Sequence, residues 1–597
     1  METLQLLWST GQPAAPPQSA KAYNHFVVPT LCSLHPPRLH RLAVGAVFAV
    51  LSVFLGALSA AAQPPASRVP DRAANRTRIL LVLPFNNHSG DPSLDWIGEA
   101  ATELISTRFR SAGFDALTRE DRMYALDHLG LPEGFQPSRA SALKLAMTLD
   151  VNFIIVGRFT TNAGDLITQA QLIDVPHLRM TQPIIASGKL RDMIAIFDSL
   201  AWELTRKLDP NLNVAEATFV AAGRNLRVDG FEQYIRGITE PDHKESLRHL
   251  DLAVKLMPGY SPAWMALGRE EYNSQEYGKA AAAFAKVDPS GADGLEAGFY
   301  RGLSLLFSGN YPQSEQTFAT VARILPLAEV INNEGVAVSR QGRNATAFFV
   351  QAAADDPNNP IYHFNLALSL KHQGNSEAAL NELAECLKLR PGDNEAQSLQ
   401  ERWKASATEP AAQPAAALGN QTSSQTNSEP GDVMDSQSAA EPQQRVVSTF
   451  DAAAFRQAAQ MLNEMDATRL AKLPPREQAR KLSSQAKGYL DRGLLLEAER
   501  LYQSAVAADP NLAEAHTGLA EVHERAGDDT AARKQAQAAL QLAPSAEAYL
   551  VLARLDLAAN HLSQANVEVN QALKLDPANR TAQGLSRQIV AKQQQRK

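Results

Sequence analysis

The chain has 597 residues, of which 45% are hydrophobic and 20% are charged. These values are ordinary for a soluble globular protein, and the length allows three or four domains. The formal net charge of -7 excludes the broadly basic surface on which nucleic-acid binding depends, and the two cysteines, Cys32 and Cys386, exclude a disulfide framework.

One long apolar run, Leu42–Ala62, stands near the start of the chain. Basic residues precede it and a small-residue A-x-A pattern ends it before Gln63, which is typical of a secretory signal peptide. We therefore expect residues 1–62 to be an N-terminal extension and signal, with the mature chain, from Gln63 onward, outside the cytoplasm. The alternative is a retained membrane anchor, because a run of this length also spans a bilayer.

Residues 63–77 are proline-rich and polar, which predicts a linker, and residues 78–210 alternate between strand-like and helix-like segments. The run ILLVLPF predicts a strand buried on both faces, and a helix is expected from about Pro92 with Asp91 as its cap. Further on, the expected elements are a strand in GFDALT, a helix capped by Ser138, three strands from NFIIVGRFT to MTQPIIASGKL, and a closing helix in MIAIFDSLAWELTRKL. The pattern predicts an α/β or α+β domain.

The loop from Asn86 to Ser93 joins a strand to a helix, the order in which many proteins hold a phosphate. It has one glycine, Gly90, and no lysine, so it fits neither the P-loop nor the dinucleotide-binding pattern. The N-terminus of its helix could still attract an anion. We interpret the loop as a structural turn capped by Asp91, and His88 as a solvated turn residue.

From about residue 231 the sequence predicts helices only, and motifs ending in proline recur. These prolines are Pro258, Pro289, Pro326, Pro357 and Pro391, and later Pro510, Pro544 and Pro577. Successive differences are 31, 37, 31 and 34 in the first group, and 34 and 33 in the second. A period near 34 with a helical pattern is typical of a helix-turn-helix solenoid.

The residues between the prolines resemble the tetratricopeptide repeat (TPR). They supply the bulky, small and aromatic positions of that repeat at Trp264, Leu267, Gly268, Ala280, Phe284, Leu366, Ala367, Ala379, Leu383, Ala486, Tyr489, Ala498, Tyr502, Leu519, Ala520, Ala532, Tyr549, Leu552, Ala553 and Ala565. The resemblance implies two superhelical solenoids, residues 211–404 with four or five repeats and residues 448–597 with three. Small residues let paired helices cross closely, while larger ones fill the gaps between pairs.

Residues 405–447 separate the two blocks and are rich in Ala, Pro, Ser and Gln. Such a composition lacks the large apolar side chains that offset the entropy of folding, which predicts a disordered linker. We expect the two blocks to be separate bodies.

The N-terminal domain carries a second resemblance. VLPFNNHSGDPSLDWIGEAATELIS and LDVNFIIVGRFTTNAGDLITQAQLIDV resemble the TolB amino-terminal-like domain, which is related to curli-assembly and flagellar accessory lipoproteins. The resemblance implies a binding or assembly domain of the bacterial envelope with no catalytic residues.

The remaining candidates favour structural roles. His516 and His523 lie seven residues apart on one predicted helix, whereas helical zinc ligands prefer a spacing of four with a third ligand nearby. Cys386 occupies a small-residue position of its repeat, which favours a buried inert thiol over a nucleophile. We predict no catalytic residue, no cofactor and no metal ion.

Binding residues are expected on the first helix of each repeat pair, which lines the concave groove of a TPR array. One position of the last three repeats carries Lys487, Glu521 and Arg554, a ladder of mixed charge. This departs from the Lys and Asn pattern by which chaperone-cochaperone repeats hold a C-terminal carboxylate.

The sequence as a whole favours a non-catalytic exported bacterial scaffold that binds protein or peptide partners in the cell envelope, with no nucleic acid. One alternative is a nucleotide-sensing or small-ligand-sensing protein or enzyme that acts through the N-terminal domain. The other is an assembly factor anchored in the membrane by Leu42–Ala62.

Overall fold

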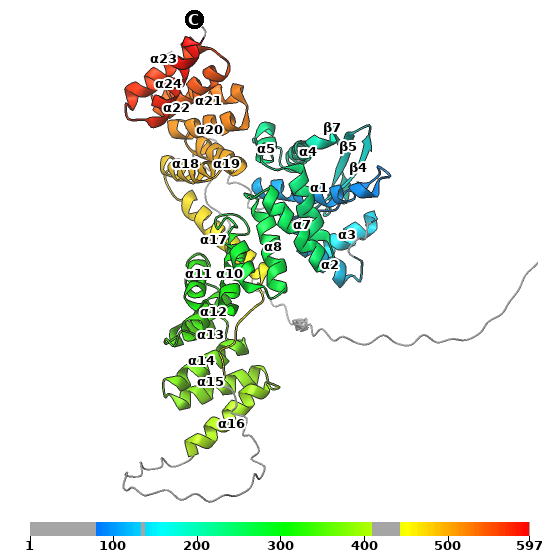
Figure 1. Cartoon of the computed structure of the whole chain (residues 1–597), viewed down its shortest axis with the longest axis vertical. Helices are drawn as coiled ribbons and strands as arrows, with labels where there is room; N and C mark the ends of the chain where they lie inside the picture. Colours follow the sequence, from blue (N-terminus) through cyan, green and yellow to red (C-terminus); the bar gives the residue numbers. More distant parts are fainter. Residues whose placement is uncertain (1–78, 133–137, 409–441, 596–597) are drawn as a thin grey trace, which may run out of the picture. The chain divides into compact units, whose positions relative to one another are not determined.

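A computed structural model describes residues 79–132, 138–408 and 442–595 (Figure 1). These residues form a sheet-containing domain followed by two helical blocks. No helix in these three ranges is both long enough and apolar enough to span a membrane. The predicted signal, Leu42–Ala62, and the linker at 63–77 lie outside the described residues.

The N-terminal domain is built on a mixed sheet. Its strands are β1 (Ile79–Val82), β2 (Asn86–Asn87), β3 (Asp115–Ala116), β4 (Phe153–Asn162), β5 (Asp165–Asp174), β6 (Arg179–Met180) and β7 (Ile184–Lys189). β1 pairs in parallel with β3 and β4, whereas β4, β5 and β7 form an antiparallel meander. The predicted third strand is divided into β6 and β7 around Pro183, whose missing N–H cannot join a strand ladder.

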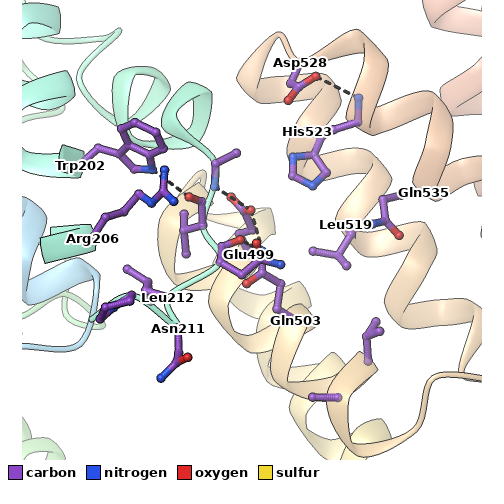
Figure 2. Close-up of a pocket in the computed structure, with 17 residues that line it drawn as sticks. Trp202, Arg206, Asn211, Leu212, Glu499, Gln503, Leu519, His523, Asp528 and Gln535 are labelled. Carbon is purple, nitrogen blue, oxygen red and sulfur yellow. Dashed lines mark hydrogen bonds between the residues drawn. The ribbon is translucent and has the colours of Figure 1, made fainter. Parts of the chain in front are cut away.

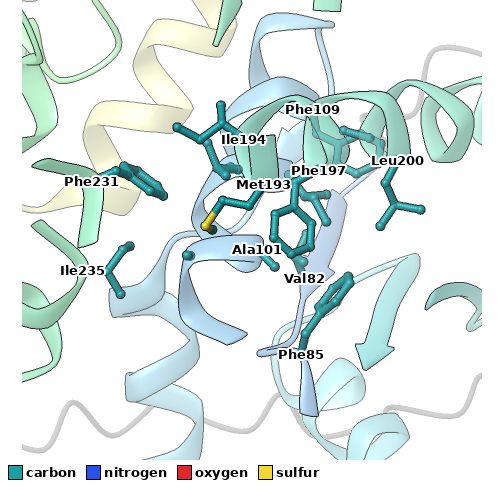
Figure 3. Packing of buried hydrophobic residues seen from close by; sticks show 14 of the residues in the cluster. Val82, Phe85, Ala101, Phe109, Met193, Ile194, Phe197, Leu200, Phe231 and Ile235 are labelled. Atoms are coloured by element: carbon teal, nitrogen blue, oxygen red, sulfur yellow. The ribbon is translucent and has the colours of Figure 1, made fainter. Parts of the chain in front are cut away.

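Both faces of β1 are buried, as the sequence predicts. Leu80 and Val82 pack on the side of α1 (Trp96–Ser111) and α4 (Met193–Leu208), and Leu81 packs on the side of α2 (Arg119–His128) and α3 (Arg139–Thr148). Figure 3 shows Phe109 of α1 and Phe197 of α4 in the first of these cores. Burying each such side chain stabilises the fold by roughly 1.5–3 kcal/mol.

This core continues past residue 210, where the sequence predicts a domain boundary. Phe231 and Ile235 of α6 (Val228–Thr239) belong to the same buried cluster as Val82 and Phe197, and Figure 3 shows them beside Met193 and Ile194. The first helical pair is therefore packed against the sheet domain through a shared apolar core.

The first helical block follows. Its helices are α5 (Glu216–Ala222), α6, α7 (His243–Leu256), α8 (Ser261–Asn273), α9 (Tyr277–Phe284), α10 (Gly294–Phe307), α11 (Tyr311–Ile324), α12 (Ala328–Ser339), α13 (Thr346–Asp355), α14 (Pro360–His372), α15 (Ser376–Leu389) and α16 (Asn394–Thr408). From α6 to α15 they pack as successive pairs. Gly302 shows why small residues are needed at the crossings: a Cβ there would lie 2.7 Å from the ring of Phe318.

The second block is also made of helical pairs. Its helices are α17 (Ala452–Ala471), α18 (Pro475–Asp491), α19 (Leu495–Ala508), α20 (Ala513–Ala526), α21 (Asp529–Leu542), α22 (Ala546–Ala558), α23 (Leu562–Leu575) and α24 (Arg580–Gln594). The pairs α18–α19, α20–α21 and α22–α23 match the three predicted repeats. The structure thus agrees with the predicted helical solenoids and with a mixed sheet near the N-terminus.

The region between the blocks differs from the prediction of a linker over residues 405–447. Residues 405–408 end α16, and residues 442–447 lie against the first block; residues 409–441 are outside the described part of the chain.

The two helical blocks, expected from the sequence to be separate bodies, are in contact. Ala221 of α5 packs into the core of the second block, and the guanidinium of Arg224 donates to the carbonyls of Arg525 and Ala526 at 3.1 and 2.9 Å. Cations are favoured at a helix C-terminus because its last carbonyls lack partners within the helix. Composition could not reveal a contact between segments about 300 residues apart.

Candidate functional site

An extended segment of the chain, residues 444–450, lies across three first helices of the first block. We call it the docked segment, and we call the surface formed by α10, α12 and α14 the first-helix face. Equivalent positions of these helices carry Phe299, Asn332 and Asn365, which are 33 residues apart in each step. The docked segment contacts these helices in reverse order, α14 first and α10 last.

Two asparagine side chains hold the main chain of the docked segment. The amide of Asn365 donates to the carbonyl of Arg445 at 2.8 Å and accepts from its N–H at 2.6 Å. The amide of Asn333 donates to the carbonyl of Val447 at 2.8 Å and accepts from its N–H at 2.9 Å. Each amide therefore makes the two hydrogen bonds that a neighbouring strand would make to an extended segment in a sheet.

Asn332 connects the two clamps. Its amide donates to the Arg445 carbonyl at 3.3 Å and to the Asn333 side chain at 3.1 Å, and it accepts from Asn365 at 2.8 Å. All three asparagines are fully buried with the segment in place. Buried amides left without partners would cost about 1–3 kcal/mol each, so the segment satisfies groups that the helices alone do not.

The side chain of Arg445 lies in an acidic site at the end of the block. Its guanidinium donates to Asp393 at 2.5 and 2.8 Å and to Glu395 at 2.7 Å, and it stacks over the ring of Phe364 at 3.5 Å from the ring centre. The hydrogen bonds from Arg445 lower the pKa of Asp393. A planar guanidinium matches this combination of carboxylates and an aromatic face better than an ammonium group does.

The other end of the docked segment is aromatic. The ring centre of Phe450 lies 5.6 Å from that of Phe299 and 6.1 Å from that of Tyr300. Phe455, at the start of α17, lies 6.0 Å from Phe299 and is buried. Between the two ends, Val446 and Val447 pack against the buried clusters of the block. The site therefore combines main-chain recognition with an arginine site and an aromatic site.

Sequence reasoning missed these residues. A signal was present, because Asn332 and Asn365 occupy equivalent buried positions of two apolar helices, where asparagine is rarely found without a partner. The second signal was RVVSTF, an apolar and aromatic run at the end of the predicted linker.

The predicted ladder of Lys487, Glu521 and Arg554 lies on the first helices α18, α20 and α22. Burial raises the pKa of Glu521, while the charges of Lys487 and Arg554 act in the opposite direction, so the three side chains interact. Arg554 also pairs with Glu524 at 2.5 and 2.6 Å, and Lys487 pairs with Asp491 at 3.0 Å. Their role in binding a partner remains a prediction.

Reversing the ladder charges by K487E/E521K/R554E is expected to weaken partner recovery by the second block about tenfold, equivalent to roughly 1.4 kcal/mol. The triple variant E497K/K534E/K574E is a matched control, since it makes the same net charge change on the second helices α19, α21 and α23. Crosslinked partner recovery from cells measures both variants. Equal recovery with the two variants would remove the ladder as a binding surface.

The other candidate residues from the sequence, His516, His523 and Cys386, have surroundings that suit a structural role. The ring of His516 bonds Gln535 and the carbonyl of Pro510, whereas His523 is buried, and burial lowers its pKa. Burial raises the pKa of Cys386 to about 11, which suits an inert thiol. Within the described residues, no group of three or more His, Cys, Asp or Glu side chains is arranged to hold a metal ion.

The loop at residues 86–93 forms a turn, as we interpreted it. Asp91 accepts from the N–H of Ser93 at 2.9 Å and caps a short 3-10 helix, Pro92–Leu94, that leads into α1. Phe85 donates its N–H to the carbonyl of Gly98 at 3.1 Å, and a Cβ on Gly98 would collide with the Phe85 carbonyl. The loop thus fixes the approach of α1 to β1.

A cavity of about 710 Å³ lies where the loop after α4 meets the second block (Figure 2). Trp202 and Arg206 line one side, and Glu499 and His523 line the other. Glu499 accepts from the N–H of Ala215 at 3.1 Å, and burial raises its pKa to about 7. The cavity therefore lies between residues 202–215, just before α5, and the second block.

Comparison with protein families agrees with the helical pairing. Residues 361–393 and residues 484–547 each match a model described as tetratricopeptide repeat. The two helical blocks contain tetratricopeptide repeats. The matches cover α14–α15 and most of α18–α21, and such repeats are scaffolds for protein–protein interaction. The comparison with curated proteins finds no match.

Three solved structures are similar to parts of the chain. YrrB, described as a TPR protein with an unusual peptide-binding site, is 15% identical, with 34% of this chain and 99% of that chain covered and a TM-score of 0.26. MamA is 13% identical, with 27% and 96% covered and a TM-score of 0.25. The C-terminal domain of LpoB from Escherichia coli is 19% identical, with 19% and 83% covered and a TM-score of 0.18.

Proposed function

We propose that the chain is a non-catalytic exported scaffold whose TPR blocks bind extended segments of protein partners in the bacterial cell envelope. The observation that carries this proposal is the pair of asparagine clamps, Asn365 on Arg445 and Asn333 on Val447. Each clamp engages both polar groups of one residue's main chain. A surface of this kind recognises an extended peptide of many sequences, as a scaffold requires.

Export is supported by the signal-like run at Leu42–Ala62, and the envelope setting by the resemblance of residues 78–210 to the TolB amino-terminal-like domain. In this proposal the sheet domain docks to an envelope component. The repeats hold further partners, so that several sites act on one assembly and raise the effective concentration of each contact.

The experiment is chemical crosslinking in the native envelope, followed by recovery of the tagged full chain and N-terminal sequencing. We expect a mature N-terminus at Gln63 and specific envelope proteins in the recovered complex. A matched variant, N333L/N365L, is expected to lose partners held by the first block and to keep those held by the second, because leucine fills a similar volume without hydrogen-bonding groups.

An uncleaved N-terminus with the same partners would favour the membrane-anchored alternative. Recovery of no envelope protein, or activity on a small molecule by the purified chain, would overturn the scaffold proposal.

A further inference from the structure

We propose that the docked segment is an internal ligand of the first-helix face, and that a partner displaces it with an extended segment of the same chemistry. That chemistry is an arginine followed by two aliphatic residues and, five positions after the arginine, an aromatic residue. The inference rests on the proposed function, since it names the kind of segment that the first block accepts.

The clamps are suited to an exchangeable ligand because they engage only main-chain atoms. Asn365 and Asn333 each pair with the N–H and the carbonyl of a single residue, and these residues, Arg445 and Val447, are two positions apart. In an extended chain, alternate residues present their main-chain groups on the same edge. Any segment in this conformation can satisfy both asparagines, and water can do so when the face is empty.

Side-chain selectivity comes from the two ends. The arginine site offers Asp393 and Glu395, which require a cation, and the ring of Phe364, which favours a flat one. The aromatic site offers Phe299 and Tyr300. Ser448 and Thr449 between them are exposed, so the face does not select the partner's side chains at these two positions.

The spacing of these sites also fixes the direction of the partner. The arginine lies near α14 and α16, Val447 at α12, and the aromatic residue at α10. A partner segment must therefore run from the last of these repeats toward the first. The reversed sequence would place its cation against Phe299 and its aromatic ring against the two carboxylates.

Covalent attachment determines how the partner competes. The docked segment is joined to α16 through residues 409–441, so it remains beside its site at any protein concentration. An attached ligand of this kind acts at an effective concentration on the order of mM. If its intrinsic dissociation constant is on the order of 10 μM, a free peptide binds the occupied face about a hundredfold more weakly than the empty one.

The test uses a fluorescent synthetic peptide with the sequence of residues 443–455 and the purified full chain. We compare the wild type with R445E/F450A, in which the attached segment has lost both side-chain anchors. We expect the peptide to bind this variant at least about tenfold more tightly than the wild type. The charge reversal R469E, on the exposed part of α17, is the matched control and is expected to bind the peptide as the wild type does.

Specificity is tested in the R445E/F450A variant, whose attached segment has lost its side-chain anchors. Adding N333L/N365L to R445E/F450A is expected to abolish peptide binding, and so is an arginine-to-glutamate change in the peptide itself. Circular dichroism of each variant shows whether the helices are retained.

A second measurement needs no variant. Hydrogen exchange of the Arg445 and Val447 amides should be slow in the wild-type chain, since both amides donate to asparagine side chains. An excess of unlabelled peptide is expected to accelerate their exchange as it displaces the segment.

Three results would overturn the inference. They are equal peptide affinity of the wild type and R445E/F450A, fast exchange of both amides in the wild type, and protection that depends on chain concentration, which would place the occupant in a second copy. None of these results bears on export or on capture of envelope partners, because the crosslinking experiment tests those two points. The two proposals can therefore fail separately.

Discussion

Replacing Asp198 with alanine is expected to lower the free energy of unfolding of the sheet domain by about 3–5 kcal/mol at neutral pH. Asp198 lies on α4, and its carboxylate accepts from the Nε of Arg108 on α1 at 2.7 Å. Both side chains are almost fully buried. Removing the carboxylate leaves the guanidinium charge without a partner in an apolar core.

The surroundings of the pair explain the size of the effect. Burial raises the pKa of Asp198 to about 6, although the charge of Arg108 opposes this shift. Gly223, just after α5, lies so close that a Cβ there would collide with the Asp198 carboxylate. The carboxylate is therefore tightly enclosed where α1, α4 and the end of α5 meet, and its loss weakens the packing of these helices.

Urea unfolding followed by hydrogen exchange in α1 and α4 measures the effect, because a chain with several cooperative units need not unfold in a single step. The matched control is D229A, which removes a carboxylate from the exposed pair Arg227–Asp229 and is expected to cost less than about 1 kcal/mol. The double variant R108M/D198L should recover most of the loss. Equal costs for D198A and D229A would show that burial of the pair is unimportant.

Local signals in the sequence predicted most of the fold. Asp91 and Ser138 cap helices as expected, because a short polar side chain can bond only the first N–H groups of the helix that follows it. The closing helix at Met193–Leu208 has the predicted bounds, since its apolar positions recur with the helical period. The repeat pairs follow from a spacing near 34 residues. The capping box formed by Thr118 and Asp121 starts α2, and it is a further local pattern from which the start of this helix could have been predicted.

The candidate site was not predictable in this way because its parts are distant in the chain. Arg445 meets Asn365 across 80 positions, and Val447 meets Asn333 across 114. A composition poor in large apolar residues predicts a stretch that does not fold alone, but it does not exclude binding by a preformed surface elsewhere. The same reason applies to α5, whose contact with the second block depends on residues about 300 positions away.

The stability of the joint between α5 and the second block is expected to fall as the pH rises from about 4.5 to 7. Glu499 of α19 is fully buried, and burial raises its pKa from the ordinary 4.5 to about 7. Below pH 4.5 the carboxyl is protonated in both the folded and the unfolded chain, and its neutral form suits the buried site. Between these values the unfolded chain releases the proton and the folded chain retains it, so unfolding becomes easier.

Glu499→Gln should remove this dependence. The amide oxygen can still accept from the N–H of Ala215, and Gln503 can still reach the carbonyl of Asn213. We expect the variant to match the wild type near pH 4.5 and to exceed its stability at pH 8 by up to about 3 kcal/mol, at 1.36 kcal/mol per unit of pKa shift. Urea unfolding of the full chain at several pH values, followed by hydrogen exchange in α19 and α20, measures the difference.

Glu514→Gln provides the matched control, because Glu514 is exposed on the neighbouring helix α20. This change should leave the pH dependence of the wild type intact. A constant difference between Glu499→Gln and the wild type from pH 4.5 to 8 would mean that Glu499 does not titrate in this range. A loss of stability in the variant at every pH would mean that the carboxylate itself holds Ala215, and that the joint depends on charge rather than on burial of a neutral acid.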